Sequence, residues 1–430
     1  MKGTSERPHD VRRLRPGFGE DENDRLKGVS LGRKAKSPST SSPKGSISLK
    51  IRATGFEPAT LWTQTTCSTK LSYTLYPLFY TAATPEPSLK PTTPTPARIL
   101  IIRPSALGDV ARTVPVLAAL KATYPAADID WVVESGFETV ITHHPALRAA
   151  IAFPKRAIKA GLRRMNFGPL LSFRAQLRAG NYDLVLDCQG LGRSGLMAWT
   201  TRATHRIGHS NAREGAAMAY TQRVAADIEM HTVDRMMTLA AAAGATAAEP
   251  DTRLYSSPAA RAWLKEQEWS REPYVVLAPT SRWPAKQWPC ERFAALASHF
   301  ADSGIGAVFS GAAGEREQIG PCLDVASRRR GVVDCVGGLP LERTMALIEG
   351  AALVVANDSA PLHIAVGFDR PLVALFGPTR VHRVGPYRRE ADVIQHVTPA
   401  DTMNHKNGAT AIMERISVDE VWRTCAARLG

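Results

Sequence analysis

The sequence predicts an α/β protein with two domains, each built around a parallel β-sheet. Two segments roughly 250 residues apart support this prediction, Arg98–Asp109 and Val354–His363. Each is an apolar run typical of a buried parallel strand, followed by a turn of small residues with an Asp where a helix should begin. Such turns present free backbone N–H groups and the positive end of a helix dipole, which α/β folds use to hold phosphate groups. The sequence therefore indicates two nucleotide-binding-like domains that face a central cleft.

Length and composition agree with two domains. The chain has 430 residues, of which 44% are hydrophobic, enough to fill two cores. The nearest candidate for a membrane span, Leu71–Ala83, is shorter than the roughly 18 residues required and is broken by Pro77. The six cysteines have no Cys-x-x-Cys spacing, which argues against a zinc site or a disulfide framework and favours a reducing compartment. We therefore expect a soluble, cytoplasmic protein.

The positive charge is unevenly distributed. The net charge is +14, and residues 1–97 supply half of it, with 15 Lys and Arg against 8 Asp and Glu. The rest of the chain is only mildly basic. This balance is consistent with an anionic ligand or a membrane surface and is weak evidence for nucleic acid.

Residues 1–97 are predicted to be a disordered or spurious leader. Residues 1–53 mix charges with Ser, Pro and Gly, and residues 84–97 form a Pro/Thr linker. Between them, Gly55–Tyr73 resembles peptides that result when non-coding DNA around transfer-RNA genes is translated, which would put the true start near Ala97. The alternative is a targeting or tethering arm, although the segment lacks the basic-then-apolar order of a signal peptide.

From Arg98 onward, strands and helices alternate. The first domain is predicted over residues 98–262, with strands at 98–103, 129–134 and 184–187, a helix near 109–123 and a segment rich in Lys and Arg after the second strand. The second domain, residues 263–430, has predicted strands at 274–279, 306–310, 353–357 and 372–376, and helices near 291–302, 341–350 and 361–367. An alternative for the last helix of the chain is that it packs back on the first domain. This alternation predicts parallel sheets with ligands at the carboxyl ends of the strands.

Asp109 follows the first strand and has two interpretations. As the residue at a helix start it is an ordinary helix cap. As a carboxylate kept ionised by the helix dipole, it is also placed to take a proton from an attacking hydroxyl. The two roles are compatible.

The segment Asp358–His363 repeats this pattern in the second half. Its backbone N–H groups and the Ser359 hydroxyl are suited to a pyrophosphate. Asp358 by itself would repel a phosphate, so we expect it to organise the loop or to bind a sugar hydroxyl. His363 considered alone is more typical of a satisfied core histidine.

Two further turns carry candidate donor-binding residues. The loop at 279–289 is dense in hydroxyls, cations and Trp, and its Thr280, Ser281 and Lys286 are suited to stabilising the charge of a departing phosphate. A packed surface loop is the alternative. Glu315 ends a strand-to-glycine turn, where an acid often accepts hydrogen bonds from ribose, although a helix-start Glu is an equal possibility.

A basic run in the first half has a default and a functional interpretation. Its members crowd ten residues, namely Lys155, Arg156, Lys159, Arg163 and Arg164. Such runs are usually solvated faces. Beside an acceptor site they would suit a phosphorylated or carboxylated sugar-lipid.

Taken in order, these residues resemble the ADP-heptose:lipopolysaccharide heptosyltransferases, glycosyltransferase family nine, and within it the heptosyltransferase I branch. The similarity runs from Arg98 to about Arg388, and its order is more specific than any single motif. The segments that carry it are Gly108–Val110, Asp130–Phe137, Tyr182–Asp183, Asp187–Leu191, Ala212–Glu214, Lys286–Pro289 and Phe376–Thr379.

The resemblance implies a GT-B fold of two Rossmann-like domains and an inverting glycosyltransferase that needs no metal or other cofactor. It implies that Asp109 is the catalytic base and that Lys286 binds the donor phosphates. The other implied donor-binding residues are Thr280, Ser281, Glu315, Asp358, Ser359, Ala360 and His363. The implied acceptor-binding residues are Lys155, Arg156, Lys159, Arg163, Arg164, Gln189 and Arg193.

The implied reaction moves heptose from ADP-heptose to an inner-core acceptor of the Kdo-lipid A type. The implied partners are a nucleotide sugar and an anionic glycolipid at the inner membrane, with no nucleic acid, and the enzyme is expected to be a monomer peripherally associated with that membrane. Two departures bear on the donor or acceptor: Ala360 replaces the usual Gly, and Arg282–Ala285 is one residue longer than expected and lacks acidic residues. The alternatives are another GT-B nucleotide-sugar enzyme, with a different donor or acting as an epimerase or hydrolase, and a non-catalytic polyanion binder.

Overall fold

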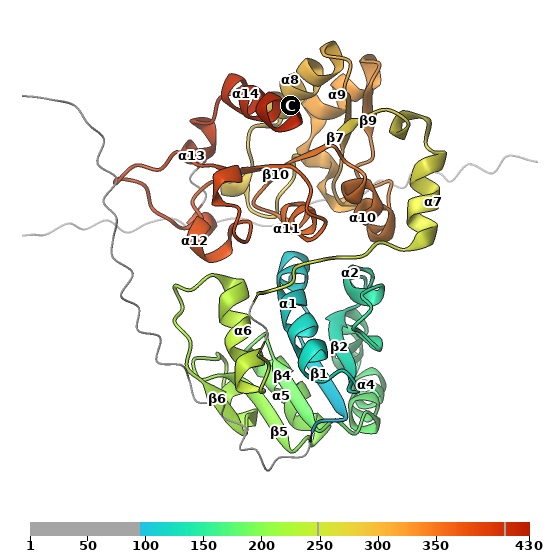
Figure 1. Ribbon diagram of the computed structural model, residues 1–430, viewed down its shortest axis with the longest axis vertical. Helices are drawn as coiled ribbons and strands as arrows, with labels where there is room; N and C mark the ends of the chain where they lie inside the picture. Colours follow the sequence, from blue (N-terminus) through green and yellow to red (C-terminus); the bar gives the residue numbers. More distant parts are fainter. Residues whose placement is uncertain (1–94, 247–248, 408–409) are drawn as a thin grey trace, which may run out of the picture. The chain divides into compact units, whose positions relative to one another are not determined.

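A computed structural model describes residues 95–246, 249–407 and 410–430 (Figure 1). These residues belong to one unit, which runs from Thr81 to Gly430. The predicted leader, residues 1–97, lies almost entirely outside the described residues. Two six-stranded parallel sheets form the framework of the described part.

The first sheet has the strand order β3-β2-β1-β4-β5-β6. Its strands are β1 (Arg98–Ile102), β2 (Asp128–Glu134), β3 (Ala149–Phe153), β4 (Leu184–Asp187), β5 (His205–His209) and β6 (Gln222–Val224). The connecting helices are α1 (Leu107–Thr123), α2 (Thr139–Thr142), α3 (Lys155–Arg163), α4 (Gly168–Ala179), α5 (Gly192–Thr201), η1 (Ala216–Ala219) and α6 (Thr232–Ala242). Residues Ile99–Ile102 of β1 are fully buried because helices cover both faces of the sheet.

The second sheet has the order β12-β11-β10-β7-β8-β9. Its strands are β7 (Tyr274–Ala278), β8 (Gly306–Phe309), β9 (Val332–Asp334), β10 (Leu353–Asn357), β11 (Leu372–Leu375) and β12 (Val393–Ile394). The longer helices are α7 (Pro258–Glu266), α8 (Cys290–Asp302), α9 (Gly320–Arg328), α10 (Leu341–Glu349), α11 (Ala360–Gly367) and α14 (Val418–Leu429). The shorter ones are η2 (Glu268–Ser270), η3 (Pro284–Lys286), η4 (Ala313–Gln318), α12 (Val381–Val384), η5 (Glu390–Asp392), η6 (His405–Asn407) and α13 (Ala411–Glu414).

Both sheets have the same topology. Numbered within its own half, each follows the order 3-2-1-4-5-6, so the strand order reverses between β1 and β4 and again between β7 and β10. In open parallel sheets, ligands bind at the carboxyl ends of the strands at this reversal. The turns after these four strands contain Asp109, Gln189, Thr280 and Asp358, all of which the sequence singles out.

The predicted elements agree closely with the observed ones. Every predicted strand is present to within one residue at either end, and the four predicted helices are present to within two. The strands that the sequence did not predict are β3, β5, β6, β9 and β12. Among them, β6, β9 and β12 are only two or three residues long and β5 is rich in His and Arg, so these four lack the apolar run that predicts a buried strand. The fifth, β3, is an apolar run of five residues that sequence reasoning missed.

Helix packing locates the connection between the two halves. The predicted domain boundary at 262/263 falls inside α7, which packs against α10 of the second half. Helix α14 packs against α8 and not back on the first half, with the Trp422 ring on Phe300 at 5.1 Å between centroids. The domain ranges themselves stay a prediction.

Within the described residues, no helix combines the length and the apolar character needed to cross a bilayer.

Trp288 anchors the loop that follows β7. Its side chain is 1% exposed, and its indole N–H donates to the Ile416 carbonyl at 2.9 Å. Replacing Trp288 with Ala should destabilise the protein by about 3–5 kcal/mol, because it opens a cavity and removes one of the two hydrogen bonds to the Ile416 carbonyl, the other coming from Arg292. Thermal unfolding measures the loss. The control is Trp283→Ala in the same loop, where the side chain is only half-buried, and equal losses for both variants would contradict the anchoring role.

Candidate functional site

Asp109 lies in the first turn of α1, immediately after the β1 turn. Its carboxylate accepts a hydrogen bond from the Ala106 backbone N–H at 3.2 Å, and its side chain is 25% exposed. Asp109 therefore does cap the start of α1, as one interpretation of the sequence proposed. Two arginines also contact its carboxylate.

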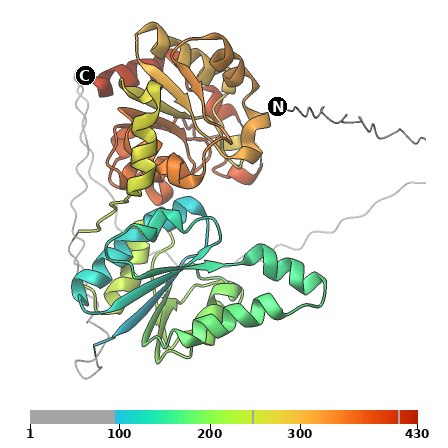
Figure 2. The same cartoon turned by 90° about the vertical axis from the view of Figure 1, so that its right-hand side faces the viewer.

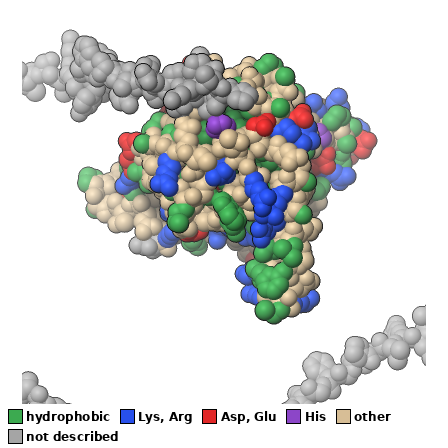
Figure 3. Space-filling model, turned by 90° about the horizontal axis from the view of Figure 1, so that it is seen from below, with side chains coloured by type: hydrophobic (Ala, Val, Ile, Leu, Met, Phe, Trp, Pro, Cys, Tyr) green, Lys and Arg blue, Asp and Glu red, His purple; other side chains and the backbone are tan. Residues whose placement is uncertain are grey.

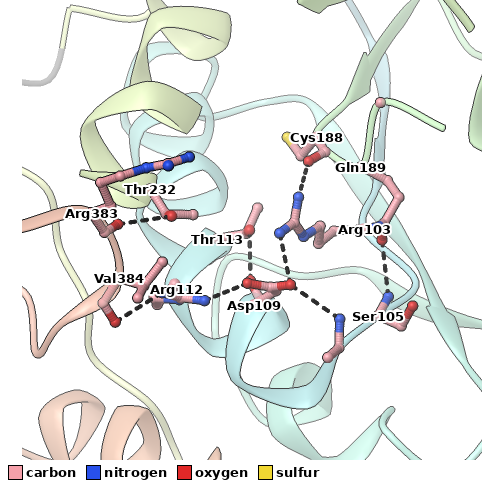
Figure 4. A network of polar contacts seen from close by, with 12 residues as sticks. Arg103, Ser105, Asp109, Arg112, Thr113, Cys188, Gln189, Thr232, Arg383 and Val384 are labelled. Carbon is pink, nitrogen blue, oxygen red and sulfur yellow. Dashed lines mark hydrogen bonds and ion pairs between the residues drawn. The ribbon is translucent and has the colours of Figure 1, made fainter. Parts of the chain in front are cut away.

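Arg103 and Arg112 hold the Asp109 carboxylate from two directions (Figure 4). An Nη atom of Arg103 lies 3.0 Å from Asp109 Oδ2, and an Nη atom of Arg112 lies 2.5 Å from Oδ1. Burial alone would raise the pKa of Asp109, but the two guanidinium charges and the Ala106 N–H outweigh it and hold that pKa well below its usual range. Asp109 is thus ionised at neutral pH chiefly because of this pair of arginines, with the helix dipole acting in the same direction.

Sequence reasoning missed both arginines. Arg103 ends the predicted strand and Arg112 is three residues after Asp109, a spacing that places two side chains on one face of a helix. That spacing was the available signal for Arg112. Arg103 also donates to the Cys188 carbonyl after β4, so one side chain connects the two turns at the reversal of the first sheet.

Gln189 and Arg193, predicted to bind the acceptor, lie beside this turn. The side-chain oxygen of Gln189 accepts from the Ser105 N–H at 3.2 Å, and an Arg193 Nη atom donates to Ser105 Oγ at 3.2 Å. Buried Asp187 shapes their loop by accepting from the Gln189 and Gly190 N–H groups at 2.9 and 3.0 Å. Ser105 thus brings both predicted residues to the β1–α1 turn.

The basic run forms the exposed face of α3 and the residue after it. Lys155 pairs with Glu134 at the end of β2, 2.9 Å apart. The other four side chains form no hydrogen bond or ion pair with any residue that the structure describes, and these are Arg156, Lys159, Arg163 and Arg164. Their charges are available to a ligand, but no contact joins them to Asp109.

In the second half, Lys286 and Asp358 form a nearly buried ion pair. Lys286 Nζ lies 2.7 Å from Asp358 Oδ2, and the two side chains are 13% and 6% exposed. Asn357 connects the supporting loops, because its side-chain N–H donates to the Pro279 carbonyl at 2.8 Å and its side-chain oxygen accepts from the backbone N–H of Trp288 at 3.1 Å. Asp358 therefore holds Lys286 in place. The expectation that Asp358 organises its own loop or binds a sugar hydroxyl stays a prediction.

Gly377 allows the Lys286 loop to approach the turn after β11. A Cβ atom at this position would lie 2.3 Å from the Ala285 carbonyl oxygen, so any other residue would push the loop away. This contact explains why a Gly stands between Phe376 and Thr379. Gly377 positions Lys286 without touching it.

Thr280, Ser281 and Glu315 lie around the β7 turn. The Thr280 hydroxyl donates to Glu315 Oε2 at 2.7 Å, and the Ala312 N–H donates to the same oxygen at 2.9 Å. Glu315 is therefore a helix cap, as one interpretation proposed, and its other oxygen stays available. Ser281 is 3% exposed, and its carbonyl accepts from the Gln287 amide at 2.7 Å.

The first turn of α11 presents an unpartnered hydroxyl. Ser359 is the residue before the helix, and its Oγ is enclosed without a hydrogen-bond partner among the described residues. Ala360 begins the helix, and Pro361 contributes no N–H. A buried donor without a partner is unfavourable in a folded protein unless a ligand supplies one.

His363 brings the two candidate turns together. A Cβ atom on Gly108 would lie 2.8 Å from the His363 ring and 3.6 Å from Ala360 Cα, so the residue before Asp109 packs directly on the first turn of α11. Burial lowers the pKa of His363 well below its usual value, and the charge of Arg112 adds to this effect. Asp109 and Lys286 are both close enough to act on this ring electrostatically.

Further polar contacts join the two halves around Arg112. Arg112 donates to the Val384 carbonyl at 3.0 Å, and the Thr232 hydroxyl donates to the Arg383 carbonyl at 3.0 Å (Figure 4). A ring nitrogen of His231 lies 3.1 Å from the Gly385 carbonyl oxygen. Within the described ranges, no three His, Cys, Asp or Glu side chains gather closely enough to hold a metal ion.

The model of glycosyltransferase family 9 (heptosyltransferase) matches residues 170–411, more than half of the chain. The chain belongs to glycosyltransferase family 9. It is therefore an enzyme that transfers a glycosyl group, which confirms the family expected from the sequence and excludes the non-catalytic polyanion binder.

Curated members of this family are similar over most of the described chain. Lipopolysaccharide heptosyltransferase 1 of Escherichia coli K12 is 29% identical over 326 residues, which cover 74% of this chain and 99% of the relative. Lipopolysaccharide heptosyltransferase 1 of Pseudomonas aeruginosa PAO1 is 31% identical over 303 residues, 68% of this chain and 82% of the relative.

Solved structures give the same result for the fold. The E. coli heptosyltransferase WaaC with ADP-2-deoxy-2-fluoro heptose has a TM-score of 0.63 at 25% identity, covering 77% of this chain and 99% of that one. The E. coli ADP-heptose lps heptosyltransferase II has a TM-score of 0.62 at 25% identity, covering 77% and 98%. Together with the two parallel six-stranded sheets, these neighbours confirm the predicted GT-B fold.

Replacing Arg112 with Gln should raise the pKa of Asp109 toward its usual value, because one of two neighbouring positive charges is lost. In the wild type, the folded pKa of Asp109 lies below the unfolded value of about 3.9, so its ionisation stabilises the fold above that pH and this contribution fades as the pH falls further. The stability difference between wild type and Arg112→Gln should thus be largest near pH 7 and should shrink below about pH 4.

Urea unfolding of both proteins at pH 7 and at about pH 2 measures this difference in stability. The bond from Arg112 to Val384 is lost at either pH, so only the pH-dependent part reports on Asp109. Arg156→Gln, which removes an exposed and unpaired cation, is the control and should show no such dependence. A stability gap for Arg112→Gln that is the same at about pH 2 and at pH 7 would contradict the proposed pairing.

Proposed function

We propose that this enzyme moves heptose from ADP-heptose to a lipopolysaccharide inner-core acceptor of the Kdo-lipid A type, with inversion at the anomeric carbon. The relatives named as lipopolysaccharide heptosyltransferases support the reaction, and the solved neighbour with ADP-2-deoxy-2-fluoro heptose supports the donor class. The observation that carries the proposal is the contact between Gly108 and His363, because it places the turn of Asp109 against the turn of Asp358.

On the donor side, the residues after β7 and β10 bind the ADP group. The enclosed Ser359 hydroxyl and the first N–H groups of α11 donate hydrogen bonds to the phosphate oxygens. Lys286 supplies the positive charge beside them. The free oxygen of Glu315 accepts from a ribose hydroxyl. Ser281 completes the phosphate site, joined by Thr280 when its hydroxyl turns from Glu315 to a phosphate oxygen, and Ala360 provides an N–H where the family more often has Gly.

On the acceptor side, Asp109 takes the proton of the attacking hydroxyl. The acceptor oxygen then bonds to the anomeric carbon as the bond from that carbon to the diphosphate oxygen breaks, and its electron pair leaves with ADP. A single displacement inverts the configuration. Lys286 stabilises the developing negative charge, which requires no metal ion in this scheme.

Arg103 and Arg112 control the basicity of Asp109. A carboxylate that is paired with two guanidinium groups is a weak base. An incoming anionic acceptor that draws Arg103 or Arg112 toward its own phosphate or carboxylate raises the basicity of Asp109 at the moment of attack. Gln189, Arg193 and the basic face of α3 hold the rest of the acceptor, a role suited to their exposed charge.

We further propose a monomer that works at the cytoplasmic surface of the inner membrane. The basic character of α3 and the lipid-linked acceptor of the relatives support this location. The alternative within the same fold is a different nucleotide sugar, or an epimerase or hydrolase. The longer segment before Lys286, Arg282–Ala285, favours testing the donor directly.

Replacing Asp109 with Ala should lower kcat by at least about 100-fold, since the proton acceptor is lost. Donor binding should change little, because the donor residues lie in the other half of the molecule. Release of ADP with a lipid A core acceptor measures the rate, and calorimetry with ADP measures binding.

Lys286→Met tests the donor side, where Asp109→Ala tests the acceptor side. It should weaken ADP binding, because the phosphates lose their cation and Asp358 keeps an unpaired charge beside them. Lys265→Met, on the exposed face of α7, should affect neither quantity. A wild-type rate for Asp109→Ala would refute the proposed base.

ADP should stabilise the protein against heat more than UDP or GDP at the same concentration, because the donor carries adenine in the proposed reaction. Incubation of the enzyme with ADP-heptose but without acceptor should release almost no ADP. Equal stabilisation by all three nucleotides argues for a different donor. Rapid release of ADP, or conversion of the sugar without acceptor, supports the hydrolase or epimerase alternative instead.

A further inference from the structure

Large exposed hydrophobic side chains are concentrated in one part of the described chain. Nine are exposed, and seven of them lie between residues 162 and 218. These seven are Leu162, Met165, Phe167, Leu171, Leu196, Trp199 and Met218. Single exposed apolar residues are normal, but a concentration of this kind marks an interaction surface.

The seven residues belong to neighbouring elements of the first half. Helices α3 and α4 form a hairpin whose turn holds Met165 and Phe167, and α4 packs against α5, which packs against η1. The hairpin extends away from the sheet (Figure 2). We call these elements, from α3 to η1, the hairpin face.

The hairpin itself is firmly attached to the first half. The Phe173 ring of α4 lies 5.3 Å from the Phe153 ring at the end of β3, and Leu177 is fully buried below it. On α3, Ile158 and Gly161 are the buried residues. The exposed apolar side chains are thus additional to those that hold the helices, and folding alone does not account for them.

The hairpin face is also strongly basic. From α3 to η1, residues 155–219 contain eleven Lys and Arg but only three acidic residues, Asp183, Asp187 and Glu214. Asp187 is fully buried and accepts a hydrogen bond from the Tyr220 hydroxyl. Figure 3 shows the projecting part of the surface, where hydrophobic side chains are flanked by Lys and Arg. Arg178, Trp199, Arg202 and Arg206 line a hollow of about 340 Å³ on the same face.

We propose that the hairpin face docks on an anionic lipid bilayer, with the turn between α3 and α4 inserted among the lipid headgroups. Apolar side chains that reach the boundary of the acyl chains, surrounded by cations that meet lipid phosphates, are the pattern of interfacial membrane binding. A Trp beside arginines suits the headgroup level. This inference deepens the proposed function and rests on it only for the lipid nature of the acceptor.

Charge decides between a bilayer and a second copy of this chain. A symmetric dimer through the hairpin face would bring eleven cations close to their counterparts, with only two exposed acids, Asp183 and Glu214, on either side. Anionic lipid supplies the missing negative charge. The bilayer is therefore the occupant that the surface fits.

The docked orientation has a consequence for the acceptor. The basic run of α3 shares the hairpin with the apolar turn, and the pair of Lys155 with Glu134 ties the start of α3 to the carboxyl end of β2. This edge of the sheet is the one that carries Asp109. A lipid-linked acceptor thus meets the α3 cations at the membrane surface before its sugar reaches the site.

Sedimentation of the full chain with vesicles tests the proposal in the absence of donor and acceptor. We expect binding to vesicles that contain phosphatidylglycerol and much weaker binding to phosphatidylcholine alone, with a loss at high salt. Met165→Glu combined with Phe167→Glu should lower the affinity at least about tenfold, because two apolar side chains leave the lipid. Ile228→Glu combined with Val397→Glu, at the two exposed hydrophobic residues outside the hairpin face, is the matched control.

A second measurement avoids any variant that disturbs folding. A polarity-sensitive dye on Met165→Cys should shift to shorter wavelength with anionic vesicles, and the same dye on Val397→Cys should not. Wild-type vesicle affinity of the Glu variant, or no shift of the dye at residue 165, would overturn the proposal. A concentration-dependent dimer that the Glu variant abolishes, without vesicle binding by the wild type, would assign the hairpin face to a second copy instead.

This test is independent of catalysis. If vesicle binding behaves as expected but no heptose transfer is found, the donor or acceptor of the proposed function is wrong and the docking surface stands. If transfer is found and vesicle binding fails, only the docking surface is wrong.

Discussion

The close packing of Gly108 on His363 is the contact on which the site depends. With no side chain on residue 108, the first turn of α1 lies directly against the first turn of α11, although the two turns are about 250 residues apart in sequence. Asp109 follows one turn and Asp358 precedes the other. The same contact makes His363 a neutral packing group, because burial and the nearby Arg112 both oppose its protonation.

The charges of the site are arranged unequally on the two sides of this contact. Lys286 and Asp358 form a pair without net charge, whereas Asp109 is shared by two arginines, which leaves one positive charge in excess. A nearly buried ion pair contributes little net stability by itself, since desolvation offsets its attraction. Stability of the fold alone therefore does not account for the pair of Lys286 and Asp358.

Much of the fold could be predicted from the sequence. The strands at the centre of each sheet are continuous apolar runs followed by small residues, and this local pattern suffices to place β1, β4, β7 and β10 and the turns after them. Because ligands of parallel sheets bind at these carboxyl ends, the same pattern selected Asp109, Thr280 and Asp358. The short strands β6, β9 and β12 were not predicted, since their pairing depends on neighbours in the sheet and not on their own residues.

The sequence by itself thus determined the alternation of strands and helices, the two phosphate-binding types of turn and the family resemblance, because each depends on residues that are adjacent along the chain. Only the tertiary structure decided that Arg103 and Arg112 share Asp109, that Lys286 pairs with Asp358, and that the Ser359 hydroxyl is enclosed without a partner. It also decided that the apolar residues of the hairpin face stay exposed. Composition shows that a side chain is charged or apolar, but its partner and its burial depend on which distant segments the fold brings beside it.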